Sequence, residues 1–384
     1  MKSVPCRKLF VAMAAMAFAV AVPAREFLAY FGTYTNALSR GIYVSRLDAD
    51  AGKLSAPELA AATPSPCFLA ISSDEKFLYA ANSIKSFNGE NAGAISAFAI
   101  NKTSGHLTFL NEKSSGGVGP CHVSVDAAGK VLLAANYGGG SVKSFRLNPD
   151  GSIGADGTVI LHHGSGVNTK RQASAHAHFI TTDPSNHFAL ACDLGLDKVM
   201  IYKLNSADAT LTTNEIPFGT VPPGSGSRHL AFSPNGKFAY VANEMGCTIT
   251  SFAWDAKHGG LTALETVDVL PPGEVLKDSY TAAEILMHPS GKFVYITLRG
   301  HDSVSVFSVA KKNGRLQFVQ NLSSGGQVPR GLGIDPTGHW LVTGNQKSDN
   351  AAVFAIDAKT GKLSPTGQSL AIGSPVDVKF VKAK

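Results

Sequence analysis

Apolar and polar residues alternate along six stretches of the chain, and each stretch reverses at a short polar segment. Residues 225–244 read SGSRHLAFSPNGKFAYVANE, which is an alternating segment, a turn rich in Pro, Asn and Gly, and a second segment carrying Phe, Tyr and Val. Alternation with a period of two is typical of β-strands, and the turn residues predict a hairpin. The pattern recurs at 65–83, 119–137, 175–194, 281–299 and 329–346. One β-hairpin is therefore repeated along most of the chain.

The spacing of these hairpins indicates a larger repeating unit. Their turns are marked by Ser73, Ala127, Pro184, Pro234, Pro289 and Pro336, so the successive steps are 54, 57, 50, 55 and 47 residues. A period of this length holds about four short strands, which is the content of a β-propeller blade. After most hairpins a third strand and a fourth strand follow, as in 248–255 and 259–269. The pattern therefore predicts six complete blades.

The two ends of the chain supply the parts of a seventh blade. Residues 374–382 match the first strand of the unit, whereas 27–35, 41–48 and 53–61 match the other three. Pairing the two ends would close the ring and leave no exposed sheet edge between the first and last blades. We therefore predict an all-β fold, a seven-bladed β-propeller closed by N- and C-terminal strands, as one domain over 25–384. Two unrelated β domains with similar turns are the alternative.

The composition and the N-terminus add a cellular context. The chain is 44% hydrophobic and only 16% charged, which suits a large β core. Lys2, Arg7 and Lys8 precede an apolar run over 9–22 and a small-residue site that ends at Ala24. This pattern predicts a cleaved secretory signal peptide over 1–24 and a periplasmic or secreted protein; a retained anchor is disfavoured because a bilayer span needs about 20 residues.

Charge and cysteine content limit the classes of partner. Removing three basic residues with the leader changes 34 basic and 28 acidic residues to 31 and 28, a net charge of +3. We therefore expect no nucleic-acid partner and no membrane binding by the mature form, while the oligomeric state stays open. Cys67 and Cys121 occupy equivalent places in adjacent blades and either pair or remain buried thiols. The chain has no Cys-x-x-Cys or His-Glu-x-x-His spacing, so we expect no metal and no cofactor.

Equivalent positions of the repeat gather charged residues on one face of the ring. Six residues before each turn stand Cys67, Cys121, His178, Arg228, Ala283 and Arg330; ten residues after it stand Ser83, Tyr137, Leu194, Glu244, Arg299 and Gln346. Because the two strands are antiparallel, both positions lie at the same end of the hairpin. We therefore expect these side chains around the mouth of the central channel.

Three arginines, a histidine and a glutamate in this set predict an anion site, because guanidinium groups suit carboxylate or phosphate. The structural alternative is that Arg228 and Glu244 only tie one blade together while Arg299 and Arg330 lie at a solvated rim. His176 shares the face of His178, and His301 follows Arg299. His122 and His229 are one step beyond the channel position, so strand alternation predicts that they face the sheet packing.

The motifs HAH with CDLGLDKV, PPGSGSRHLAFSPNGKFAYVANE and AEILMHPSGKFVYITLRGHDSV resemble those of the β-propeller lactonases, which include bacterial 6-phosphogluconolactonase and fungal carboxymuconate lactonizing enzyme. The resemblance covers nearly the whole mature chain. It implies that His178, Arg228, Glu244 and Arg299 bind and turn over an acid lactone. Ser227 and Leu298 depart from the residues that the family often has, Pro and Asn, but neither removes a charge. The phosphorylated lactone that the resemblance suggests is cytosolic, whereas this protein is predicted to be exported. The resemblance therefore leaves the substrate open.

Together these features predict hydrolysis of a sugar or sugar-acid lactone, an aldonolactone, at the channel mouth. The expected catalytic residues are His178, Glu244, Arg228 and Arg299, and the expected substrate-binding residues are Arg330, His176, Tyr137, Gln346 and His301. The arginines would stabilise the oxyanion, and either His178 or Glu244 would be the general base. No Gly-x-Ser-x-Gly motif is present, which disfavours a serine nucleophile. Lactonisation of a carboxymuconate-type dicarboxylate and non-enzymatic periplasmic anion binding are the alternatives.

Overall fold

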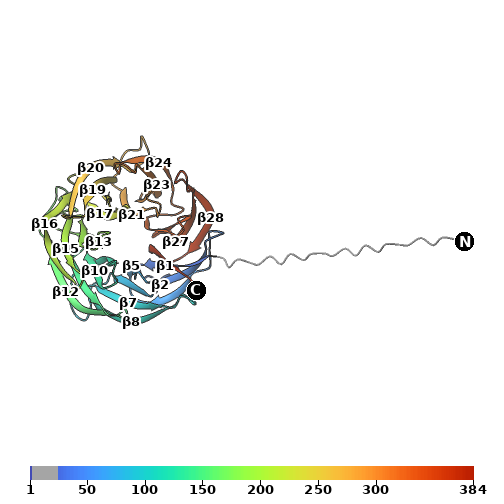
Figure 1. The fold of residues 1–384 in the computed structure, drawn as a ribbon, viewed down its shortest axis with the longest axis horizontal. Helices are drawn as coiled ribbons and strands as arrows, with labels where there is room; N and C mark the ends of the chain where they lie inside the picture. Colours follow the sequence, from blue (N-terminus) through green and yellow to red (C-terminus); the bar gives the residue numbers. More distant parts are fainter. Residues whose placement is uncertain (2–24) are drawn as a thin grey trace.

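The computed structural model describes Met1 and residues 25–384, and this part of the chain forms seven antiparallel sheets arranged as a ring (Figure 1). The predicted seven-bladed β-propeller is therefore confirmed. Apart from Met1, the predicted signal peptide lies outside the described residues. Within those residues no helix is long and apolar enough to cross a membrane.

Six blades are consecutive in sequence and have four strands each. In chain order the strands are β5 (Pro66–Ile71), β6 (Phe77–Asn82), β7 (Ala94–Ile100) and β8 (Leu107–Ser114); β9 (Pro120–Val125), β10 (Val131–Asn136), β11 (Ser141–Leu147) and β12 (Ile153–Leu161); β13 (Ala177–Thr182), β14 (Phe188–Asp193), β15 (Lys198–Asn205) and β16 (Thr210–Thr220); β17 (Ser227–Phe232), β18 (Phe238–Asn243), β19 (Thr248–Asp255) and β20 (Gly260–Asp268); β21 (Thr281–Met287), β22 (Phe293–Arg299), β23 (Ser303–Val309) and β24 (Leu316–Ser323); β25 (Pro329–Ile334), β26 (Trp340–Asn345), β27 (Asn350–Ile356) and β28 (Leu363–Ala371).

The seventh blade joins the two ends of the chain. It contains β29 (Pro375–Lys382), β1 (Glu26–Thr33) and β2 (Gly41–Asp48), with the short β3 (Lys53–Leu54) and β4 (Glu58–Ala62) both paired to β2. β29 runs antiparallel to β1, from Phe27 opposite Lys382 to Thr33 opposite Pro375. The predicted closure is therefore confirmed, and every inner strand has neighbours on both sides around the ring.

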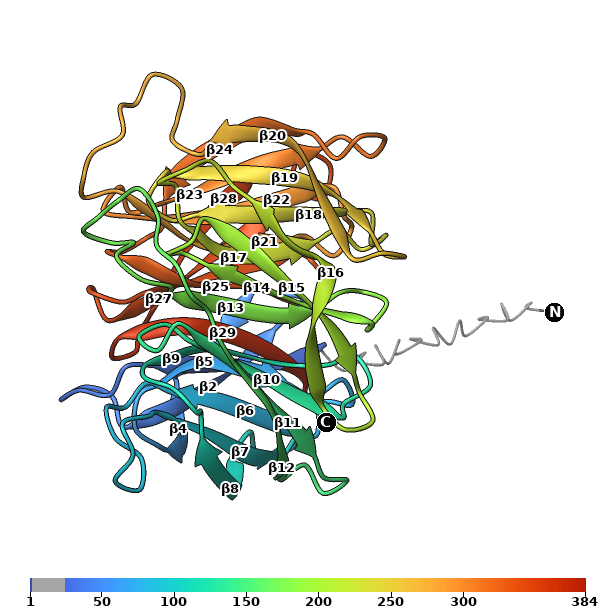
Figure 2. The same ribbon diagram turned by 90° about the vertical axis from the view of Figure 1, so that its left-hand side faces the viewer.

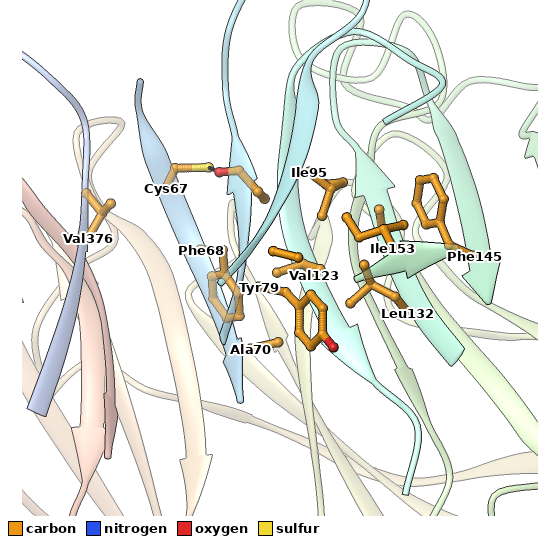
Figure 3. Close-up of a cluster of buried hydrophobic side chains, with 13 residues drawn as sticks. Cys67, Phe68, Ala70, Tyr79, Ile95, Val123, Leu132, Phe145, Ile153 and Val376 are labelled. Carbon is orange, nitrogen blue, oxygen red and sulfur yellow. Dashed lines mark hydrogen bonds between the residues drawn. The ribbon is translucent and has the colours of Figure 1, made fainter. Parts of the chain in front are cut away.

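Apolar packing between adjacent blades holds the ring together. Seven clusters of buried hydrophobic side chains each join neighbouring blades. Figure 3 shows one of them, in which Tyr79 and Ile95 of one blade pack near Val123 and Ile153 of the next. Cys67 in the same cluster is a buried free thiol, as is Cys121, so the structure does not pair them. Burial of apolar area between blades is thus the main stabilising contribution.

A repeated tyrosine hydrogen bond also joins neighbouring blades. Four buried tyrosines of β1, β6, β18 and β22 each donate a hydrogen bond of 2.9–3.0 Å to the carbonyl of a turn glycine in the following blade; the pairs are Tyr30–Gly105, Tyr79–Gly151, Tyr240–Gly314 and Tyr295–Gly361. Because these hydroxyls are buried, each bond satisfies groups that water cannot reach. The bond also fixes the height of one blade against the next.

We therefore expect Tyr240→Phe to lower the free energy of unfolding by about 1–2 kcal/mol, because the carbonyl of Gly314 loses its partner in a buried place. Urea unfolding followed by intrinsic fluorescence measures this change. Tyr43→Phe is the matched control, since the Tyr43 hydroxyl only accepts a 3.4 Å hydrogen bond from the backbone of Arg40 at an exposed place. Equal losses in the two variants would contradict a bond that specifically ties adjacent blades.

Candidate active site

The inner strands share one irregularity, which lies where the channel side chains are. In β17, Ser227 pairs with Asn243 and His229 with Ala242, so Arg228 has no opposite residue. The same step leaves Cys67, Cys121, His178, Arg330 and Val376 unpaired in their strands, and in β21 the step spans Ala283 and Glu284. A β-bulge places two residues of one strand opposite one of its partner and re-aims their side chains. The residue after the bulge therefore also turns to the channel.

This irregularity overturns the expectation for His122 and His229. Their rings lie 5.4 Å apart between centroids although β9 and β17 belong to blades that are not adjacent. Both rings also contact Phe68 and Phe179, which occupy the same position in two other blades. The prediction that strand alternation turns these histidines toward the sheet packing was wrong, because the bulge interrupts the alternation. These four side chains form a layer across the channel, called the channel floor below.

Above the channel floor lies a cavity of about 340 Å³. It is lined by Tyr34, Ser83, Gly119, Cys121, Tyr137, Gly138, Arg171, His178, Glu244, Arg299 and Arg330. Five of the nine residues predicted for the site are in this lining. Arg228 lies directly beside the cavity and contacts Glu244. The size falls at the lower end of the range of about 300–1,000 Å³ for small-molecule sites.

Glu244 is held by three arginines. Its Oε2 accepts from Arg228 Nε at 2.9 Å and lies 2.9 Å from Arg299 NH2, while its Oε1 accepts from Arg171 NH2 at 2.7 Å. Burial alone would raise the pKa of this carboxyl, but the charges of Arg299, Arg228 and Arg171 hold it well below its usual range. Both Glu244 oxygens are thus occupied, and the carboxylate orders the arginines around it.

The cavity keeps an excess of positive charge. Within residues 25–384, the Arg330 guanidinium has no carboxylate within ion-pair distance, and its nearest aromatic contact is the Tyr34 ring at 5.6 Å. The buried Nε of Arg299 also has no hydrogen-bond partner there. Burial and the charges of Arg299 and Arg330 lower the pKa of Arg228 to about 10, which still leaves it protonated at neutral pH. One glutamate therefore faces four arginines, and the site can accept a further anion.

His178 is the titratable side chain in the lining that can take up a proton. It is 4% exposed, and its Nδ1 lies 3.2 Å from Nε2 of His229. Burial, followed by the charges of Arg228 and its other cationic neighbours, lowers the pKa of His178 well below its ordinary value. The imidazole is therefore neutral at pH 7, and Nε2 is the ring nitrogen available to a ligand in the cavity.

The remaining predicted residues lie farther out. The ring of His176 stacks on Tyr137 at 4.5 Å, and its Nδ1 is 3.0 Å from the Tyr137 carbonyl oxygen, so it supports a lining residue. Nδ1 of His301 lies 2.6 Å from the hydroxyl oxygen of Ser303. Neither His301 nor Gln346 is in the cavity lining. In the described part of the chain, no group of three or more His, Cys, Asp or Glu side chains is placed to hold a metal ion.

The spacing of the repeated hairpins did not predict that Arg171 and Tyr34 line the cavity. Arg171 lies in the long segment between β12 and β13, and besides Glu244 it donates to the Tyr137 hydroxyl at 3.3 Å. The segment between β20 and β21 lies next to it, since Asn168 and Leu276 line one cavity, and Figure 2 shows both segments on the same face of the ring. Neither segment belongs to the repeated hairpin, so only the Lys170-Arg171 pair in an irregular stretch could have drawn attention to this position.

Comparison with known proteins agrees with this architecture. The profile of the family described as "Lactonase, 7-bladed beta-propeller" matches residues 28–380. A 6-phosphogluconolactonase of Bacillus subtilis is 36% identical over 356 residues, which is 93% of this chain and 99% of that protein. The solved structure of a periplasmic gluconolactonase from Pseudomonas aeruginosa has a TM-score of 0.86 at 31% identity and covers 94% of this chain and 100% of its own. This chain therefore belongs to the family of seven-bladed β-propeller lactonases.

Proposed function

We propose that the mature protein hydrolyses a sugar or sugar-acid lactone of the aldonolactone class in the cavity at the channel mouth. The observation that carries this proposal is the surplus of arginine over carboxylate in a small cavity that also holds a neutral histidine. The names of two relatives, a 6-phosphogluconolactonase and a periplasmic gluconolactonase, support the same substrate class. The latter relative also supports a periplasmic location after cleavage of a leader over 1–24.

In this proposal, His178 is the general base. Water adds to the lactone carbonyl carbon and gives a proton to Nε2 of His178, and the same proton passes to the ring oxygen when its bond to that carbon breaks. The product is the hydroxy acid. Arg299 and Arg330 face the oxyanion and any acidic group of the substrate, with Arg171 and Tyr137 at the outer wall.

Glu244 has a different role from a base. A base needs a free lone pair that faces the substrate, whereas both carboxylate oxygens of Glu244 are engaged by guanidinium groups of three arginines. We assign it the ordering of Arg228, Arg299 and Arg171. Of the two bases left open by the sequence, the contacts therefore favour His178.

Acid release at neutral pH tests the proposal across a panel of gluconolactone, its 6-phosphate, an aromatic lactone and a carboxymuconolactone, with spontaneous hydrolysis subtracted. We expect turnover of an aldonolactone. The ratio of kcat/KM with and without the 6-phosphate tells whether the cavity recognises a phosphate group. Turnover of the muconolactone alone, or of none of the panel, would contradict the proposed substrate class.

Arg330→Gln should reduce kcat/KM by about 10- to 150-fold, since a charge-assisted hydrogen bond contributes roughly 1.5–3 kcal/mol. The fold should be unaffected, because this guanidinium has no carboxylate partner within the described residues. Steady-state kinetics and thermal unfolding measure the two effects. Lys170→Gln, a change of charge one residue from Arg171 but outside this cavity, is the control and should keep wild-type kinetics. Unchanged kinetics in Arg330→Gln would remove Arg330 from the site.

Glu244→Gln should lose both activity and stability. The variant leaves Arg228, which is 2% exposed, without its charge partner, and breaking a buried ion pair costs about 3–5 kcal/mol. Denaturant unfolding measures the loss of stability, and kcat with a saturating lactone measures the loss of activity. A Glu244→Gln protein of wild-type stability would show that the arginines do not depend on this carboxylate.

A further inference from the structure

Below the proposed base, a chain of hydrogen bonds runs through three successive blades. Nδ1 of His178 in β13 lies 3.2 Å from Nε2 of His229 in β17, and Nδ1 of His229 lies 2.9 Å from Oε1 of Glu284 in β21. The three side chains are buried, at 4%, 1% and 3% exposure. Glu284 is the residue that shares the irregular step of β21 with Ala283, which turns its carboxyl to the channel floor.

The direction of donation along this chain follows from its inner end. Oε1 of Glu284 also accepts the backbone N–H of Ile285 at 3.3 Å, so this oxygen is an acceptor on both sides. Nδ1 of His229 must then donate to it, which leaves Nε2 of His229 as the acceptor. Nδ1 of His178 consequently carries the proton that is donated to His229. The Nε2 atom of His178 is left with a lone pair, which is what a general base requires.

We propose that His229 and Glu284 are positioning residues that hold His178 in the tautomer with an unprotonated Nε2 and stabilise the imidazolium that forms during hydrolysis. The inference rests on the proposed function, because it gives His178 its partners in that reaction. It also accounts for two buried polar side chains that the reaction scheme otherwise leaves unused. When water gives its proton to Nε2 of His178, the Nδ1–H bond to His229 strengthens, and the carboxylate of Glu284 on the other side of His229 stabilises the new positive charge.

The charge of Glu284 decides how strong this stabilisation is. The charged and titratable groups around it are His229, which it contacts, and Arg228, Arg330, Asp377 and Lys379; His122 and His178 lie on the other side of His229. Burial raises the pKa of Glu284 to about 7, against the lowering effect of Lys379 and Arg228. As the pH falls through about 7, Glu284 takes up a proton and loses the negative charge that favours the imidazolium. Turnover should therefore fall in the same range.

The tautomer is tested first, without any substrate. Nitrogen-15 chemical shifts of labelled histidine in the wild-type protein distinguish a protonated Nδ1 from a protonated Nε2, and the signals of His178 are identified by their absence in His178→Gln. We expect the Nδ1-protonated form at pH 8. The Nε2-protonated form would overturn the inference whether or not any lactone is hydrolysed, so this measurement separates it from the proposed function.

Glu284→Gln then tests the charge, because the amide oxygen can keep both hydrogen bonds. We expect kcat to fall by about 10- to 100-fold with KM changed by less than about threefold, and the inflection near pH 7 to disappear. Glu265→Gln, the same substitution on β20 at a carboxylate that accepts from Leu316 at 2.7 Å, should keep the wild-type profile. A folded Glu284→Gln protein with wild-type kcat and the same inflection would overturn the proposal.

Discussion

The bulge at the start of the inner strands is the constraint on which the site depends. A regular strand sends successive side chains to opposite faces, so each blade would place only every second residue in the channel. The unpaired residue in β9, β13 and β17 turns two consecutive side chains inward, as with Arg228 and His229. The outer member of each pair reaches the cavity and the inner one reaches the channel floor. The same irregularity thus lets one ring of strands contribute to both the cavity and the channel floor.

Electrostatic interactions then position the charged side chains at the cavity. Arginines gathered at one end of a narrow channel repel each other, and Glu244 offsets this repulsion through ion pairs of 2.7–2.9 Å to three of them. The fourth, Arg330, lines the cavity and forms no ion pair within the described residues. A carboxylate that is buried and fully engaged does not have to reorganise when charge develops on a substrate, so the arginines are already oriented for an anion.

The ring of strands and the irregular segments between blades position different residues of the site. Inter-blade clusters and the tyrosine bonds hold the seven inner strands in place, because core packing tolerates little displacement. The segments 162–174 and 271–280 connect consecutive blades, and the first of them brings Arg171 to Glu244.

The sequence by itself determined the ring, its closure by the two ends of the chain, and the face on which His178, Arg228, Glu244, Arg299 and Arg330 meet, because hairpin period and antiparallel pairing are local properties of the chain. It could not assign His122 and His229 to the channel, since a bulge interrupts the alternation from which their direction was inferred. It also missed Arg171, whose position depends on the path of a long irregular segment. Only the tertiary structure decided these points, because contacts across the channel join residues from different blades, and no periodicity along the chain encodes their distances.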